Sequence, residues 1–225
     1  MKAMVLRTCP EAVLIDVSHS VPPFEIGAGA FVLWAGTRHF GAGAVHLAVV
    51  DPGVGGARRA LSVEVGGSWF VAPDNGLLET VLEEGSGVAA AYELARAPDA
   101  APTFEGRDVF APAAGALASG AAPSSLGTPI DPAGLVRLPG GGPRVIWIDH
   151  FGNLVLNLRP PARSLRVGTV DVTALARTFA AAPADVPFCY EGSMGRLEIG
   201  FAKGRAADLV RAAIGTPVTE LPLTT

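Results

Sequence analysis

The 225-residue sequence predicts an α/β domain followed by a small all-β domain. Apolar runs near residues 12–17 and 44–50 flank a segment with helical spacing, which is the pattern of two parallel strands joined by a helix. The first run ends in a loop with two prolines, Pro22 and Pro23, and the second in a turn of Asp, Pro and Gly at 51–56. After residue 143, short strand-like runs follow one another, and a single helix is expected after the last of them.

The first domain is expected to be a mostly parallel sheet flanked by helices. Ala12–Val17 and Ala44–Val50 read as strands buried on both faces, and Ile26–Phe40 as the helix between them, with Gly41 at its C-cap. Met1–Thr8 reads as the end of a helix. Shorter strands are expected at 61–65, 69–72 and 91–95, and further helices at 76–84 and 109–119.

The domain boundary is predicted in the glycine- and proline-rich region around residues 139–143. We expect an α/β domain over 1–128, a linker over 129–143 and a β-barrel-like domain over 144–225. Within the last, strands are predicted at 145–149, 153–158, 167–172 and 196–201, with a helix at 205–214. This pattern is typical of a small barrel or a sandwich.

The composition excludes several classes of protein. A hydrophobic content of 49% with 17% charged residues indicates a globular chain, and a net charge of −4 gives no sign of nucleic-acid binding. No apolar run approaches the ~18–20 residues of a membrane span. The first residues show no signal-peptide pattern, so we do not expect export. Cys9 and Cys189 lie far apart in the sequence, and we expect reduced thiols in a cytoplasmic protein.

Two turns carry side chains suited to ligand chemistry. Asp51 directly follows an apolar strand, with Arg58 shortly after it, and the second turn holds Asp74 and Asn75. Carboxylates on Gly/Pro turns at strand ends are where α/β proteins place ligand sites. A surface hairpin also needs Asp and Gly, so a purely structural role is the alternative.

Six segments together resemble one family. They are DVSHSVPPFEIGAGA (16–30), VVDPGVGGARR (49–59), VAPDNGLL (71–78), TFEGRDVFAPAA (103–114), IDHFGNLVLN (148–157) and GSMGRLEIG (192–200). In order and content they are similar to the S-adenosyl-L-methionine (SAM) hydrolase (adenosine-forming) family, also called SAM hydroxide adenosyltransferase, related to fluorinase and chlorinase. The halogenating relatives carry an insertion after the first turn that this chain lacks, so the resemblance favours the hydrolase branch.

The resemblance implies an α/β domain, then a barrel-like domain, assembled as a homotrimer with the ligand between neighbouring subunits. It implies attack of water on the ribose C5′ of SAM, giving adenosine and L-methionine without a cofactor. In the family an Asp, an Arg and a His hold that water; Asp51 and Arg58 match the first two. A salt bridge that only fixes the loop is the alternative reading for this pair.

The third family position differs in this chain. Where the family has His in a TFHGRD-like run, this sequence has Glu105. A second carboxylate near Asp51 predicts either that one carboxyl is protonated, giving a pH dependence in the weakly acidic range, or that Arg58 and Arg107 share the negative charge. Under this resemblance, Glu105→His is expected to restore the family triad and raise activity.

Other positions match the family's binding residues. Asp149, Phe151 and Asn153 match the adenine-binding motif, with Phe151 stacking on the base, although a β-turn at Gly152-Asn153 would explain the same residues. Ser193 matches a position near the methionine or adenine end. Asp74 and Asn75 are expected to support the pocket.

No metal is expected. His19 could be grouped with Asp16, Asp51 and His150, but their spacing fits no standard zinc pattern, and His150 reads as a residue at the rim of the site. The family also has an earlier strand, ending in a TDFG-like turn that holds the ribose hydroxyls. The printed sequence begins at a position that matches the helix after it.

Two other functions stay open at this point. A SAM- or adenosine-binding protein with little turnover is suggested by Glu105 and by the unmatched N-terminal strand. A purely structural trimer would bind neither SAM nor adenosine.

Overall fold

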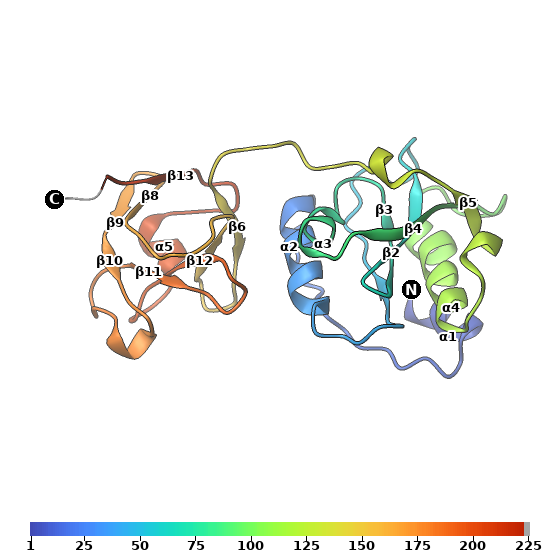
Figure 1. Cartoon of the computed structure of the whole chain (residues 1–225), viewed down its shortest axis with the longest axis horizontal. Coiled ribbons are helices and arrows are strands. Elements are labelled where there is room, and N and C mark those ends of the chain that lie inside the picture. The colour runs from blue at the N-terminus through green and yellow to red at the C-terminus, as the bar shows by residue number, and fades with distance from the viewer. Residues whose placement is uncertain (223–225) are drawn as a thin grey trace. The chain divides into compact units, whose positions relative to one another are not determined.

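The computed structural model describes residues 1–222, so the last three residues of the predicted second domain lie outside it. The chain forms two compact units, which divide between Leu138 and Pro139. In Figure 1 the first is coloured from blue through green to yellow, and the second from yellow to red. No helix in the described part of the chain has the length and apolar character needed to cross a membrane.

The first unit contains one five-stranded sheet. Its strands are β1 (Val45–Leu47), β2 (Ala60–Val65), β3 (Ser68–Pro73), β4 (Val88–Leu94) and β5 (Gly127–Pro129), in the order β1-β3-β2-β4-β5. The prediction of a mostly parallel sheet is wrong, because β1–β3 is parallel whereas β2–β3, β2–β4 and β4–β5 are antiparallel. The Gly66-Gly67 turn reverses the chain between β2 and β3, with φ of +60° and +76° that only glycine adopts readily.

The helices of this unit are short. They are α1 (Lys2–Thr8), α2 (Ile26–Thr37), α3 (Glu79–Glu84) and α4 (Ala111–Ala118), with a π-helical turn, η1 (Gly106–Phe110), directly before α4, and 3₁₀ turns η2 (Pro123–Ser125) and η3 (Pro132–Gly134). The α2 helix ends earlier than predicted, with Arg38 rather than Gly41 as its C-cap. In its last turn the Thr37 hydroxyl donates to the Leu33 carbonyl.

Two separate cores cover the two faces of this sheet. Alternate strand residues point to opposite faces. Leu61 and Val63 therefore pack with Leu33 of α2 and Val81 of α3. On the other face, residues of β2, β3 and β4 pack with α1, η1 and α4; this core includes Val5, Ala60, Val71, Leu94, Val109 and Phe110. The sheet is thus a layer between two pairs of helices.

The predicted strand at Ala12–Val17 is absent. The segment is extended but pairs with no strand among the described residues, and Val13 and Ile15 are 86% and 63% exposed. The predicted strand–helix–strand crossover is therefore wrong as well. A continuous apolar run shows that a strand could be buried, but it does not show which strand would pair with it.

The second unit has two sheets, and the prediction of a barrel-like closure is not met. One sheet has the order β10-β11-β12-β7-β6 and the other β13-β8-β9. Residues of both sheets and of one helix share a single core, which includes Val145, Leu154, Leu165, Val172, Leu197 and Ile199. Its elements are β6 (Val145–Ile148), β7 (Leu154–Leu156), β8 (Leu165–Val167), β9 (Val170–Val172), β10 (Ala174–Leu175), η4 (Phe179–Ala181), β11 (Phe188–Glu191), β12 (Leu197–Gly200), α5 (Ala206–Val210) and β13 (Val218–Glu220).

Candidate active site

The strand directions of the first unit bring several polar side chains together at one end of the strands. β1 and β3 are parallel and end there, and β2, antiparallel to both β3 and β4, begins there. Asp51 follows β1, Arg58 precedes β2, Asp74 follows β3 and Arg96 follows β4. Residues that are distant in the sequence are therefore neighbours in the fold.

Asp51 and Arg58 form a buried ion pair. Arg58 Nε donates to Asp51 Oδ1 at 3.0 Å, and Arg58 Nη2 contacts Asp51 Oδ2. The Asp51 side chain is 3% exposed and that of Arg58 is 10% exposed. The guanidinium also lies over the Phe110 ring, 5.3 Å from its centre. This two-point contact fixes the Asp51 carboxylate and leaves it little rotational freedom.

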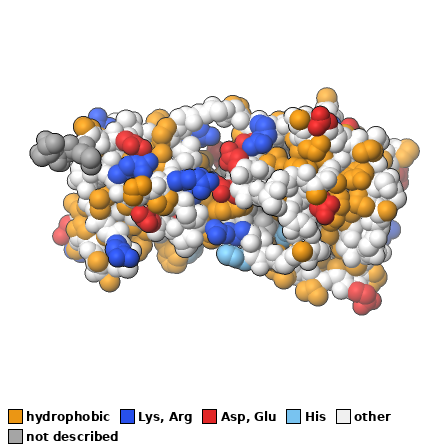
Figure 2. All heavy atoms as spheres, in the orientation of Figure 1, with side chains coloured by type: hydrophobic (Ala, Val, Ile, Leu, Met, Phe, Trp, Pro, Cys, Tyr) orange, Lys and Arg blue, Asp and Glu red, His pale blue; other side chains and the backbone are white. Residues whose placement is uncertain are grey.

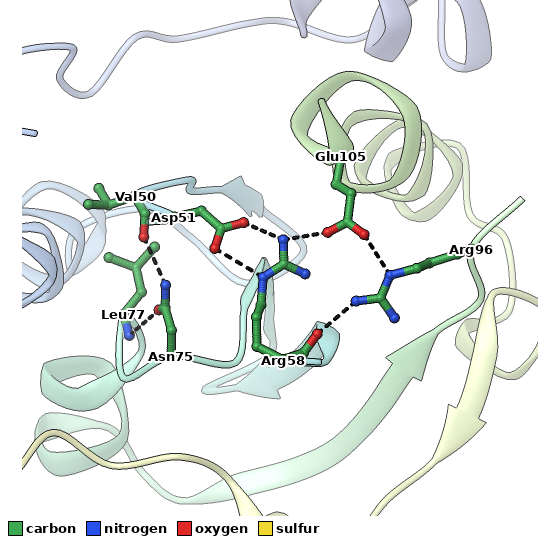
Figure 3. A network of polar contacts seen from close by, with 7 residues as sticks. All are labelled: Val50, Asp51, Arg58, Asn75, Leu77, Arg96 and Glu105. Atoms are coloured by element: carbon green, nitrogen blue, oxygen red, sulfur yellow. Dashed lines mark hydrogen bonds and ion pairs between the residues drawn. The ribbon is translucent and has the colours of Figure 1, made fainter. Parts of the chain in front are cut away.

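Glu105 lies on the other side of Arg58 (Figure 3). It stands at the start of the π-helical turn η1, and its carboxylate forms an ion pair with Arg58 Nη2. The Arg96 Nε donates to the other oxygen, Oε1, at 2.6 Å, and Arg96 Nη2 donates to the Arg58 carbonyl at 2.7 Å. Asp51, Arg58, Glu105 and Arg96 are called the ion-pair cluster below. It joins two carboxylates and two guanidiniums.

The electrostatics of Glu105 differ from the sequence prediction. Burial raises the pKa of its carboxyl, but the hydrogen bonds from Arg96 and Arg58 outweigh this, so that the pKa lies below the ordinary 4.5. Of the two alternatives, a protonated carboxyl is therefore not favoured at Glu105. The other alternative named the wrong second arginine, because Arg107 Nε and Nη2 donate to the Asp108 carboxylate at 2.6 and 2.7 Å. Arg96 supplies the second positive charge.

One donor of the cluster is left open. Arg58 Nη1 is buried and has no hydrogen-bond partner among residues 1–222. In Figure 3 this amino group points to the side of Arg58 on which Arg96 lies. Buried N–H groups in native proteins are nearly always paired, often with an ordered water. The cluster therefore offers a water-sized ligand a charged donor on the side of Arg58 away from Asp51.

Asp74 and Asn75 hold the turn after β3. Asp74 is 5% exposed, accepts from Arg59 Nε at 2.7 Å and accepts from the Val136 amide at 2.9 Å. The Asn75 side chain donates to the Val50 carbonyl at 2.9 Å, next to Asp51, and accepts from the Leu77 amide at 3.1 Å. Asn75 thus ties this turn to the chain leading into Asp51.

The second unit places the other predicted residues on a tight turn between β6 and β7. The Asp149 carboxylate accepts from the Asn153 amide and from its Nδ2, both at 2.8 Å. Gly152 has a φ of +85°, and a Cβ there would lie 2.5 Å from the Cβ of Arg205. Asp149 and Asn153 therefore stabilise the turn, whereas Phe151 at its tip is 74% exposed.

The exposed ring stands at the border of an open hollow. The hollow has a volume of about 530 Å³ and is lined by Phe151, Phe179, Phe201, Asn153 and Arg205, among others. Aromatic rings with a few polar groups are suited to a flat heterocycle. Ser193 lies on a different turn, between β11 and β12, and is exposed.

A buried polar pair, Tyr190 and Glu198, lies near Asp149 of the turn between β6 and β7. Tyr190 donates its hydroxyl to the Glu198 carboxyl, and Glu198 is 9% exposed. Burial raises the pKa of Glu198, the Tyr190 hydrogen bond opposes the shift, and the charge of Asp149 adds to it. Burial and the neighbouring Glu198 also raise the pKa of Tyr190. Here the carboxyl shares a hydrogen bond with a tyrosine hydroxyl, and burial favours its neutral form.

The residues weighed as metal ligands do not come together. His19 Nε2 lies 3.0 Å from Asp16 Oδ1, with 73% of the His19 side chain exposed. The His150 ring packs against Phe151, in the other unit. In the part of the chain that the structure describes, no group of three or more His, Cys, Asp or Glu could hold a metal ion.

The sequence reasoning missed Arg96 and Glu198. Arg96 lies two residues beyond the end of β4, with no turn motif to mark it, and the only available signal was its position near a strand end. Glu198 is part of the segment 192–200, but it lies within a strand and looks like any alternating polar residue.

The fold and this cluster define a two-unit protein with ion-paired side chains at one end of the strands of a mixed sheet. Comparison with known families is specific. Residues 1–127 match the N-terminal domain, and residues 143–219 the C-terminal domain, of SAM hydroxide adenosyltransferase. The chain belongs to this family.

Individual relatives agree with this assignment. A protein of Salinispora arenicola named (R)-S-adenosyl-L-methionine hydrolase is 42% identical over 94% of this chain and 87% of its own length. A fluorinase of Actinoplanes sp. is 28% identical over 70% of this chain and 65% of its own. The crystal structure of an uncharacterized conserved protein from Thermotoga maritima has a TM-score of 0.87 and 30% identity, covering 96% of this chain and 92% of that one.

Proposed function

We propose that this chain hydrolyses SAM to adenosine and L-methionine. The observation that carries the proposal is the buried Asp51–Arg58 pair, in which Arg58 fixes the Asp51 carboxylate and keeps one guanidinium N–H open. Membership of the family and 42% identity to a protein named (R)-S-adenosyl-L-methionine hydrolase support the same reaction.

The reaction requires little beyond a well-placed water. The water oxygen forms a bond to the ribose C5′ while the C5′–S bond breaks and its electron pair returns to sulfur, which leaves as the neutral thioether of methionine. The water proton passes to a carboxylate or to solvent. The sulfonium is already a good leaving group, so orientation and partial desolvation of the water are what the protein supplies. In this proposal Arg58 donates to that water and Asp51 accepts from it, and no cofactor is needed.

Adenine is assigned to the hollow beside Phe151. The exposed ring offers a stacking surface, and Asn153 and Arg205 add polar contacts at its border. We further propose the family's homotrimer, in which this hollow of one subunit would complete the site of another. Ser193 is assigned to the same ligand. The cytoplasmic location stays a prediction from the sequence.

The test is to incubate the purified protein with SAM and to follow adenosine and methionine by chromatography. In water enriched in ¹⁸O, attack at C5′ places the label in the 5′-hydroxyl of adenosine. Label in that position supports the proposal. Binding of SAM or adenosine without release of adenosine identifies a binding protein, and absence of binding in calorimetry indicates a structural trimer.

Arg166→Gln is the matched control for variants of Arg58. Arg166 forms a two-point ion pair with Asp171 at 2.6 and 3.0 Å on β8 and β9, outside the cluster. Its replacement removes a comparable ion pair and should leave adenosine formation unchanged.

A further inference from the structure

Arg96 is the one member of the ion-pair cluster to which neither the reaction nor the family motif assigns a role. Its side chain is 34% exposed, but its Nε and Nη2 reach Glu105 Oε1 and the Arg58 carbonyl. Arg96 thus contacts Glu105 through its carboxylate and Arg58, which carries the open guanidinium N–H, through its backbone carbonyl. It does not contact Asp51 in the structure (Figure 3).

The charges of the cluster balance only if Arg96 is included. Asp51 and Glu105 contribute two negative charges within contact of one guanidinium, that of Arg58. Glu105 is 3% exposed, so solvent screens its charge poorly. Without Arg96, two carboxylates would compete for Arg58, and Asp51 would share its partner with an unbalanced buried charge.

A histidine at position 105 would need no such partner. A neutral imidazole carries no charge to balance, so Arg58 could serve Asp51 alone. With Glu at this position, a second cation must hold the carboxylate away from Asp51. The Glu105–Arg96 pair therefore has the same net charge, zero, as a neutral histidine.

We propose that Arg96 is a positioning residue, which together with Glu105 takes the place of the family's histidine and keeps Arg58 directed at Asp51. This inference rests on the proposed function. It changes the expectation for Glu105→His, because a histidine introduced alone leaves Arg96 without its anionic partner beside Arg58. The two positions should be exchangeable only as a pair.

The test is a double-mutant cycle of Arg96→Gln, Glu105→His and both together, with kcat and KM measured for SAM. Each single variant should lose kcat by about tenfold or more, and the double variant should regain most of it, so that the two effects are coupled by at least about tenfold. In this proposal Arg96 holds Glu105 and the Arg58 backbone and does not bind SAM, so KM should change little. Losses that simply multiply would overturn the inference.

The pH profile separates positioning from general damage. In Arg96→Gln, Glu105 loses a cation that lowers its pKa and keeps Arg58 and the negative Asp51 as neighbours. The acid limb of the kcat profile should therefore move up by about one pH unit. Arg96→Lys, which keeps the charge, should restore the position of that limb. A limb that stays in place in Arg96→Gln would contradict the proposal.

Arg107→Gln is the matched control. Arg107 is two residues from Glu105, but its guanidinium binds Asp108 and lies over the Phe104 ring. This variant should leave kcat and the acid limb unchanged. An inactive parent protein would overturn the proposed function and this inference together, whereas an active parent without coupling between positions 96 and 105 would overturn the inference alone.

Discussion

Two buried glutamates, one in each unit, have opposite electrostatic settings. Glu105 is 3% exposed and is held between two arginines, which lower its pKa despite burial. Glu198 is 9% exposed and has Tyr190 as its partner, and burial raises its pKa. Burial alone therefore does not decide the charge of a carboxyl; the partner does. The first unit holds fixed charges, and the second holds an open aromatic hollow above a turn.

The difference predicts that the first unit serves the attack of water and the second binds the base, and mutations can test this. Asp51→Asn and Arg58→Ala should lower kcat by about 10²–10³-fold, since each removes a group that holds the attacking water. Adenosine affinity should change far less, because the base is assigned to the second unit. Steady-state kinetics and calorimetry measure the two quantities. Equal losses of both would show that the two units do not divide the work in this way.

The second prediction compares the two glutamates directly. Glu105→Gln removes one partner of a buried ion pair and leaves Arg96 and Arg58 uncompensated, so it should lower the free energy of unfolding by about 3 kcal/mol. Glu198→Gln keeps an oxygen that accepts from Tyr190, and should cost about 1 kcal/mol or less. Chemical denaturation at neutral pH measures both values. A larger loss for Glu198→Gln would reverse the comparison.

The third prediction sharpens the role of the second unit. Phe151→Ala should weaken adenosine binding by about 1–3 kcal/mol, the value of base–aromatic stacking. Its ring is 74% exposed, so the free energy of unfolding should hardly change. Val13→Ala offers a matched control, since Val13 is 86% exposed in the other unit. Unchanged affinity in Phe151→Ala would place adenine elsewhere.

The smallest expected effect is the dependence of stability on pH. The folded-state pKa of Glu105 is lowered, so its contribution is present above the ordinary 4.5 and is lost as the pH falls below it. The folded-state pKa of Glu198 is raised, so its contribution is present below 4.5 and is lost as the pH rises. Glu105→Gln should therefore flatten the acid loss of stability, and Glu198→Gln should deepen it. Melting curves between pH 3 and 7, on the basis of these shifts, would show the same sign for both variants if the comparison is wrong.

Parts of the fold could be predicted because they depend on local pattern. The helix beginning at Ile26 lies in a long apolar segment, and Gly66-Gly67 marks the turn between two short apolar strands. Strand pairing could not be predicted in the same way. The apolar runs at 12–17 and 44–50 look alike in sequence, yet only the second contains a strand, β1, because pairing depends on neighbours that the run itself does not specify.

The candidate site was predictable where a motif carries it. Asp51, Arg58 and Glu105 lie together in the structure, and family motifs indicated all three. Arg96 could not be predicted, because its contact with Glu105 depends on β4 ending beside the start of β2. For the same reason the second guanidinium was assigned to the wrong residue: the sequence offered Arg107, whereas Arg96 binds Glu105 in the structure.

The extended segment at 12–17 also affects how the protein behaves at high concentration. Val13, Ile15 and Val17 are exposed, and hydrophobic side chains are visible on the surfaces of both units in Figure 2. Nearby, β1 is an edge strand, paired only with β3 among the described residues. Unpaired strand edges and exposed apolar segments favour aggregation of protein molecules. Charged substitutions at Val13 and Ile15 should therefore reduce light scattering in concentrated samples while leaving the ion-pair cluster untouched.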